Sequence, residues 1–275
     1  MKLDKVSDRV YANCEGKTGG NVGIIVLDDS VIAVDAQYPG SALDFRASIR
    51  SVTEKVVSHL ILTHIHGDHI YGSQAFEDCE IVAHRRLKEK MEASLKDEWS
   101  PEKLEKMLID MKVNRPERYW LFNGLKIVLP TKTFDDNMNL DGLEIQNLGG
   151  HSDCSSVIYV PEDKTLFAGD LIFAGRFPWA GDLTSHPETW IKSFENMLAM
   201  DVDAIVPGHG PICGKEEIET QLKWFKEASS IMRNLIREGA SLEESVKPVH
   251  YPVFYDSSGG RLERSLSHWY KVLSQ

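Results

Sequence analysis

The chain alternates between short apolar runs and segments in which apolar residues recur every three or four positions. Short runs bounded by turn residues are typical of strands, whereas the longer spacing is typical of amphipathic helices. Up to residue 84 the pattern predicts two strands within 21–36 joined by a turn at 28–30, a helix over 44–52, a buried strand over 56–64, a short helix after Gly72 and a strand over 80–84. This order, strand then polar loop then helix, is the one with which α/β proteins build sites at the C-terminal ends of strands.

Residues 85–123 have a different character, because they are highly charged and carry Met and Leu at helical spacing. Ser100 followed by Pro101 is a favourable N-cap and first-turn pair. The pattern predicts a helical insertion with two open roles: a pair of amphipathic helices that covers the core, or a lid that leans over a site. The aromatic candidates for such a lid are Trp99, Tyr119 and Trp120.

Strand patterns resume after the insertion. They predict a strand over 125–131, a hairpin of 137–140 with 143–149 around Asp141-Gly142, a hairpin over 155–172 with Pro161 and Asp163 in its turn, a helix over 186–200, a strand over 203–210, and helices over 215–238 and 261–273. No linker rich in Pro, Gly or Ser and no short repeat interrupts the sequence. We therefore expect one α/β domain over residues 1–275 that carries the insertion.

Charge and cysteine usage narrow the class of protein. The formal net charge of −11 argues against a nucleic-acid partner, because neutralising phosphates needs clustered Lys and Arg, although a local positive mouth for a small anion stays compatible with it. No apolar run approaches the roughly 20 residues that span a bilayer, and residues 1–16 lack the apolar core of a signal peptide. The four cysteines are scattered without a CxxC pair. We expect a cytoplasmic protein with reduced thiols and no membrane association.

The motif THIHGDH concentrates four candidate metal ligands directly after a predicted strand: His64, His66, Asp68 and His69. Imidazole together with carboxylate suits zinc, iron or manganese, whereas calcium prefers oxygen ligands alone. Gly67 lacks a side chain and lets the backbone turn sharply between these residues. Four ligands on one short loop do not easily surround a single ion, so two ions sharing the loop are the more natural geometry.

Two ions need further ligands, and three later residues occupy a similar position in the chain. His151 in LGGHSD, Asp170 in LFAGD and His209 in IVPGHG each follow an apolar run and lie beside glycine, which allows close approach of the backbone to a ligand. We expect these residues to complete the metal site.

In this order and spacing, the motifs THIHGDH, GGHSD, FAGD and PGHG resemble those of the metallo-β-lactamase fold metallohydrolase superfamily, over essentially the whole chain. The resemblance implies a four-layer αββα sandwich, with two central sheets flanked by helices and the site at one edge. It also implies two ligand sets that share a bridging carboxylate. These are His64, His66 and His151 for the first metal, Asp68, His69 and His209 for the second, and Asp170 for the bridge. Asp35, in the early motif GGNVGIIVLDDSVIAVDA, is expected to lie behind the ligands or to be structural.

Two ions a few ångströms apart can hold a bridging water and lower its pKa towards neutrality. We therefore expect a dinuclear metal-dependent hydrolase, whose metal-bridging hydroxide cleaves an ester, thioester or lactone bond, or an amide, in a small-molecule substrate. Zinc is the expected metal, although this donor set also accepts iron and manganese. Asp68 is expected to accept and shuttle the proton; the alternative is that it serves as a ligand alone.

Several branches of the superfamily stay open. A carboxylate bridge resembles the glyoxalase II-like and lactonase-like branches, and GRFPWAGD resembles poorly characterised cyclase-like or SoxH-like members. The competing function is that of the mononuclear-iron persulfide dioxygenases, which use only the equivalents of His64, His151 and Asp170. A metal-bearing regulatory scaffold is the non-enzymatic alternative.

The substrate-binding residues are not identified by the motifs. Four residues after the Asp170 motif form an apolar loop with one cation, which either packs against the core or walls a pocket in which Arg176 orients an acidic group. They are Phe173, Arg176, Phe177 and Trp179. A homodimer is an open assembly state, because residues 85–123 can form either a lid or a dimer interface.

Overall fold

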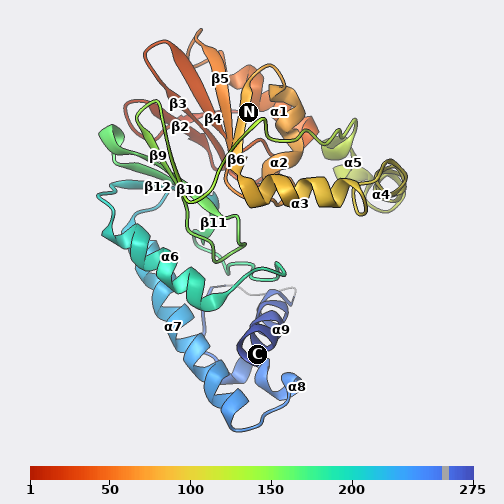
Figure 1. The fold of residues 1–275 in the computed structure, drawn as a ribbon, viewed down its shortest axis with the longest axis vertical. Helices are drawn as coiled ribbons and strands as arrows, with labels where there is room; N and C mark the ends of the chain where they lie inside the picture. The colour runs from red at the N-terminus through yellow and green to blue at the C-terminus, as the bar shows by residue number, and fades with distance from the viewer. Residues whose placement is uncertain (256–259) are drawn as a thin grey trace.

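The computed structural model describes residues 1–255 and 260–275, and in these residues the strands form two sheets (Figure 1). In spatial order, the first sheet contains β1 (Asp4–Lys5), β2 (Val10–Asn13), β3 (Val22–Val26), β4 (Ser30–Val34), β5 (Val56–Leu62), β6 (Glu80–His84) and β7 (Lys132–Phe134). The second contains β12 (Ala204–His209), β11 (Thr165–Phe173), β10 (Ser156–Val160), β9 (Leu143–Asn147) and β8 (Asn137–Leu140). The strands β4 to β7 run parallel, as do β11 and β12, whereas the other neighbours are antiparallel.

Helices cover the outer face of each sheet (Figure 1). On the side of the first sheet lie α1 (Pro39–Ile49), α2 (Gly67–Ile70), the 3-10 helix η1 (Tyr71–Phe76), α3 (Arg85–Leu95), α4 (Pro101–Asn114) and α5 (Pro116–Phe122). The later helical segments are η2 (Pro161–Asp163), α6 (Pro187–Ala199), α7 (Lys215–Arg237), α8 (Leu242–Ser245), η3 (Pro248–His250) and α9 (Arg261–Leu273). Within the described residues, no helix has both the length and the apolar character needed to cross a membrane.

The layers follow from side chains that alternate along each strand. In β4, Ile32 and Val34 belong to the apolar layer between the sheets, whereas Val31 and Ala33 point to the layer shared with α1 and α3. A third apolar layer joins the second sheet to α6, α7 and α9, with Trp190 fully buried within it. The four-layer αββα sandwich expected from the sequence is therefore confirmed.

The structure differs from the predicted elements in three places. The expected strand over 125–131 is irregular up to residue 130, and the strand that follows β5 and β6 in the sheet is β7. Pro130 offers no N–H for a ladder, and the apolar side chains before it are half-buried against the core. The helix expected over 44–52 begins at Pro39 and ends at Ile49. The strands β1 and β2 were not expected, because they are short and pair at the sheet edge.

The segment 85–123 forms α3, α4 and α5, with Ser100 and Pro101 at the start of α4 as expected. The helix α5 packs on α1: the rings of Tyr38 and Phe122 lie 4.6 Å apart, and a Cβ on Gly40 would come within 2.5 Å of the Trp120 carbonyl oxygen. The end of the segment is thus held against the N-terminal part of the chain.

Candidate metal centre

The motif THIHGDH forms the connection between β5 and α2. Its first two histidines lie in the loop that follows β5, and His66 is the N-cap of α2 with an extended backbone. Asp68 and His69 then lie in the first turn of α2. The change from strand to helix lets His64 and His66 face one side of the centre while His69 faces the other.

The three later residues arrive from the second sheet. His151 lies in the loop between β9 and β10, and His209 is the last residue of β12. Asp170 does not end its strand as the sequence suggested, because β11 continues to Phe173. The pairing of β11 with β12 instead becomes irregular at Gly169, which turns the Asp170 carboxylate towards the centre.

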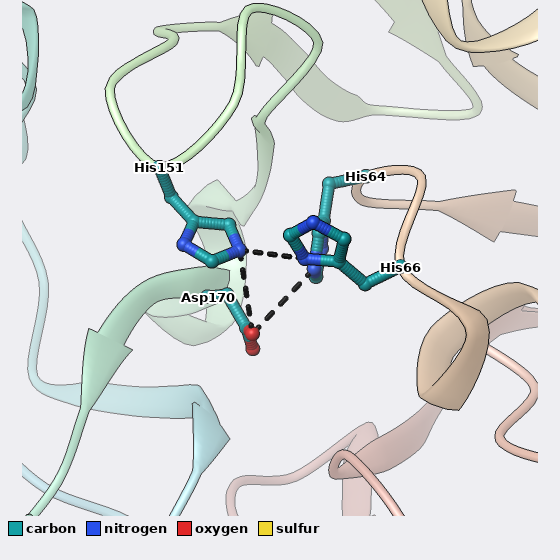
Figure 2. A group of neighbouring side chains, drawn as sticks. All are labelled: His64, His66, His151 and Asp170. Atoms are coloured by element: carbon teal, nitrogen blue, oxygen red, sulfur yellow. Dashed lines mark hydrogen bonds and ion pairs between the residues drawn. The ribbon is translucent and has the colours of Figure 1, made fainter. Parts of the chain in front are cut away.

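One group of donor atoms comprises His64, His66, His151 and Asp170, all within 4.8 Å of one another (Figure 2). Figure 2 shows the three rings and the carboxylate pointing towards a common space. The Oδ2 atom of Asp170 lies 3.5 Å from Nε2 of His64 and 3.5 Å from Nε2 of His151. This arrangement places three imidazole nitrogens and one carboxylate oxygen where one ion can meet all four.

The second group comprises Asp68, His69 and His209, whose donor atoms also lie within 4.8 Å of one another. The other carboxylate oxygen of Asp170, Oδ1, faces this group at 3.1 Å from Nε2 of His69 and 3.4 Å from Nε2 of His209. The two oxygens of Asp170 therefore face the two groups separately.

Several buried donor atoms in the centre lack a hydrogen-bond partner. They are Nε2 of His64, Nε2 of His69 and Oδ1 of Asp170. Although His69 and Asp170 approach each other, their atoms do not meet hydrogen-bond geometry. Buried polar atoms without partners are costly, so an arrangement that leaves three around one space is expected where a cation binds them.

The contact between His66 and His151 also indicates a cation-binding site. Nδ1 of His151 donates to the Trp179 carbonyl at 3.0 Å, and Nε2 of His66 donates to Asp182 at 2.9 Å. With these protons assigned, Nδ1 of His66 and Nε2 of His151 present lone pairs to each other at 2.8 Å. A cation between the two nitrogens removes this repulsion, so the residues fit a metal ion.

The histidines of the two groups differ in protonation. Burial, together with neighbouring His69, lowers the pKa of His64 to about 4, and burial also holds the pKa of His151 well below its usual value. Burial opposes the charge of His209 too, but the carboxylates of Asp170 and Asp68 outweigh it and raise its pKa to about 9. The rings of His64 and His151 in the first group are therefore neutral and keep free lone pairs. In the second group, His209 carries a proton and a positive charge.

Two carboxylates hold the ligands from behind. Asp35 accepts hydrogen bonds from Nδ1 of His69 at 2.7 Å and from the backbone and hydroxyl of Thr63 at 2.8 Å each, so it orients His69 and the end of β5 as the sequence suggested. Asp182 orients His66, and it accepts further bonds from the backbone N–H and hydroxyl of Thr184.

The sequence analysis missed Asp182. The spacing of Asp182 and Thr184 is typical of a local turn, but nothing in the sequence connects this turn with His66, which lies 116 positions earlier. The network extends to the insertion, because Lys90 of α3 donates to Thr184 at 3.0 Å and also pairs with Asp153.

A cavity of about 630 Å³ opens over the centre and is lined by His66, Asp68, Asp170 and His209. Of the loop that follows Asp170, Phe173, Arg176 and Trp179 line the cavity. Phe177 does not, since it is buried against Trp224 and Phe254. The loop therefore packs against the core through Phe177 and forms part of the cavity wall through Arg176 and Trp179.

The insertion reaches the cavity through a residue that the sequence analysis did not single out. Arg118 of α5 lines the cavity, whereas the candidate lid residues Trp99, Tyr119 and Trp120 do not. Trp99 packs on Tyr71 instead, and Trp120 is half exposed. The segment contributes a charged wall and no aromatic cover.

Two neighbouring clusters of His and Asp lie at one edge of the αββα sandwich. This combination is typical of metal-binding α/β proteins. The model of the metallo-beta-lactamase superfamily matches residues 16–209, a range that contains all seven candidate ligands. The chain belongs to this superfamily, as the resemblance of its motifs indicated.

Individual relatives are distant. The chain is 24% identical over 237 residues to a linear primary-alkylsulfatase from a Pseudomonas species, covering 75% of this chain and 45% of that protein, so it spans less than half of that relative's length. It is also 24% identical over 280 residues to the alpha subunit of a 2,4-dinitroanisole O-demethylase from a Nocardioides species, covering 96% of this chain and 75% of that protein.

Among solved structures, the fold is similar to that of the DIM-1 metallo-beta-lactamase, with a TM-score of 0.63 and 16% identity. The superposition covers 82% of this chain and 97% of that one. At this identity the likeness establishes the fold alone.

Proposed function

We propose that the protein is a dinuclear metal-dependent hydrolase that cleaves an ester, thioester or lactone bond in a small molecule. The observation that carries this proposal is the position of Asp170, whose Oδ2 faces the first donor group and whose Oδ1 faces the second. A carboxylate with one oxygen towards each group is the arrangement needed for a bridge between two ions. We further propose zinc as the metal and the cytoplasm as the place of action.

In this proposal His64, His66 and His151 hold the first ion, Asp68, His69 and His209 hold the second, and Asp170 bridges them. Bound divalent ions supply an activated water and polarise the electrophilic group of the substrate. The protein's own contribution is to hold the donors in place.

Asp68 is proposed to accept the proton released in the reaction. It is the partly exposed carboxylate of the centre and lines the cavity, whereas Asp170 is buried. Oδ2 of Asp68 lies 3.2 Å from Nε2 of His209, so the carboxylate stands between the cavity and the second group, where it can meet a proton released from the substrate side.

The named activities of the two relatives widen the set of substrates to be tested. One relative is named for action on primary alkyl sulfates and the other for O-demethylation of 2,4-dinitroanisole. Sulfate esters and activated aryl ethers therefore join carboxylic esters, thioesters and lactones as candidates.

The deciding experiment is metal analysis of protein purified without added metal, followed by turnover assays with each of these substrates, a cephalosporin and a persulfide. About two metals per chain and hydrolysis of an ester, thioester or lactone support the proposal. One iron per chain with oxygen consumption on a persulfide would instead establish the dioxygenase function.

A matched pair of variants tests the bridge. Asp170→Ala is expected to keep the fold but lose most activity and part of the bound metal. Asp201→Ala, at a surface carboxylate that pairs with Lys164, serves as the control and is expected to keep both. Full activity in Asp170→Ala would refute the bridging role.

A further inference from the structure

The walls of the cavity are rich in cations, although the chain as a whole carries a net charge of −11. The cationic lining residues are Lys17, Arg118, Arg176, Arg261 and Arg264. They come from the segment between β2 and β3, from α5, from the loop after β11 and from the first turn of α9. The fold therefore brings like charges together from four distant parts of the sequence.

Within the part of the chain that the structure describes, three of these five cations have no carboxylate partner. Among the described residues, no carboxylate forms an ion pair with Arg118, Arg176 or Arg261, whereas Lys17 pairs with Glu15 at 3.2 Å. Arg118 lies near Tyr38, which also lines the cavity. Arg176 lies beside Gly16, since a Cβ there would be 3.8 Å from its Nη2 atom.

The negative charges of the cavity lie elsewhere. Its acidic lining residues are Asp68 and Asp170, and both belong to the candidate metal centre. Phe173 and Trp179 add apolar surface to the lining. The cavity thus combines a metal centre, an apolar wall and a set of arginines, and guanidinium groups match the planar geometry of carboxylates and the oxygens of phosphates and sulfonates.

We propose that the cavity takes an amphiphilic anion, whose apolar part lies against Phe173 and Trp179. An oxyanion remote from the scissile bond is held by Arg118, Arg176 and Arg261. This inference rests on the proposed function and deepens it, because it makes the substrate an anionic ester, thioester or lactone. The insertion and the C-terminal helix α9 then act as parts of one binding site.

Binding can be measured apart from turnover. Isothermal titration calorimetry of the metal-loaded protein at low ionic strength would use hexanoate, hexane-1-sulfonate and hexyl phosphate as probes, with hexan-1-ol as the neutral counterpart. We expect the anions to bind more tightly than the alcohol, and added salt to weaken them. The order of the three anions identifies which oxyanion the arginines prefer.

Three variants test the assignment: Arg118→Gln, Arg176→Gln and Arg261→Gln. Each is expected to weaken the preferred anion about 5-fold, as for partly exposed charge pairs, without changing the metal content. Arg115→Gln, at the N-cap of α5, and Lys271→Gln, in α9, remove exposed charges outside the cavity. Both variants should bind the anions like the unsubstituted protein.

Unchanged anion binding in all three arginine variants would overturn the proposal, because it would place the anion at the metals alone. The activity arm compares mono-4-nitrophenyl glutarate with 4-nitrophenyl valerate. A preference for the anionic ester that the arginine variants lose through KM, with kcat retained, supports the inference. Equal turnover of both esters would reject it while leaving the hydrolase function intact. Arginine-dependent anion binding without hydrolysis of any ester, thioester or lactone in the panel would reject the hydrolase function alone.

Discussion

The substitution Asp182→Asn tests whether His66 is a metal ligand held by its neighbour. In the structure, Oδ2 of Asp182 accepts the Nε2 proton of His66 at 2.9 Å, and Oδ1 accepts bonds from the hydroxyl and N–H of Thr184 at 2.6 and 2.7 Å. Asparagine has the same shape, but one of its two positions must hold NH2. If that group faces His66, two donors meet, and the ring is driven to the tautomer that carries its proton on Nδ1.

The expected magnitude follows from this geometry. A proton on Nδ1 of His66 occupies the atom that faces His151 at 2.8 Å, and metal binding must first remove it. If the amide flips instead, its NH2 meets the backbone N–H of Thr184, which cannot rotate away. Loss of such a partner behind a metal ligand typically weakens metal affinity about 10- to 100-fold, or about 1.4–2.7 kcal/mol.

The assay is a competitive zinc titration against a chromophoric chelator, with thermal unfolding of the metal-free protein as a check on the fold. Asp29→Asn, an exposed Asp in the turn between β3 and β4, is the matched control and should bind zinc like the unsubstituted protein. Zinc affinity in Asp182→Asn within twofold of the control would refute the reasoning, since neither tautomer control nor ligation by His66 would then matter.

Three further results are expected. Gly208→Ala should reduce the metal content, measured by mass spectrometry, because a Cβ would lie 2.0 Å from Oδ1 of Asp170. The overpacking should cost about 1–3 kcal/mol of stability. Unaltered metal content would show that the carboxylate can move without consequence. Asp163→Asn should lower the free energy of unfolding at pH 7 by about 1.5–3 kcal/mol, because the carboxylate accepts bonds from Ser7 and Arg9. Although burial opposes the charge of Asp163, those bonds hold the pKa of its carboxyl below the usual value. The difference in the free energy of unfolding between variant and unsubstituted protein should therefore be full above about pH 4 and vanish as the pH falls through the lowered pKa. A difference independent of pH would contradict this. Chelation should lower the melting temperature, since ligand at 100 times its Kd stabilises a folded protein by about 2.7 kcal/mol, and an unchanged melting temperature in differential scanning calorimetry would argue against metal binding.

The local elements of the fold were largely predictable, because the pattern that predicts each element lies within its own residues. The turn of Asp141-Gly142 is an example: both residues have positive φ, and the hairpin of β8 and β9 forms around them as predicted. The failures have equally local causes. An apolar run ending at Pro130 satisfies a strand pattern without a partner to pair with, and the uninterrupted burial of β11 hides the place where its ladder becomes irregular.

The residues of the candidate centre could be named from the sequence because metal-binding side chains have a recognisable chemistry. Histidines and aspartates beside glycines at the ends of apolar runs have few other uses at such density. This chemistry does not reveal the partner behind each ligand. Asp182 looks like an ordinary turn residue, and Arg118 looks like one of many charges on an exposed helix.

The sequence by itself determined the periodicity of the elements, the class of fold and the candidate ligands, because these depend on short-range patterns and residue chemistry. Only the tertiary structure decided that Asp170 turns one oxygen to each donor group, that Asp182 holds His66, and that α5 and α9 place arginines around one cavity. These relations join residues far apart in the sequence, and Asp182 and His66 are separated by 116 positions. They arise when two sheets pack face to face and bring the ends of β5, β11 and β12 to the same edge, which no local pattern encodes.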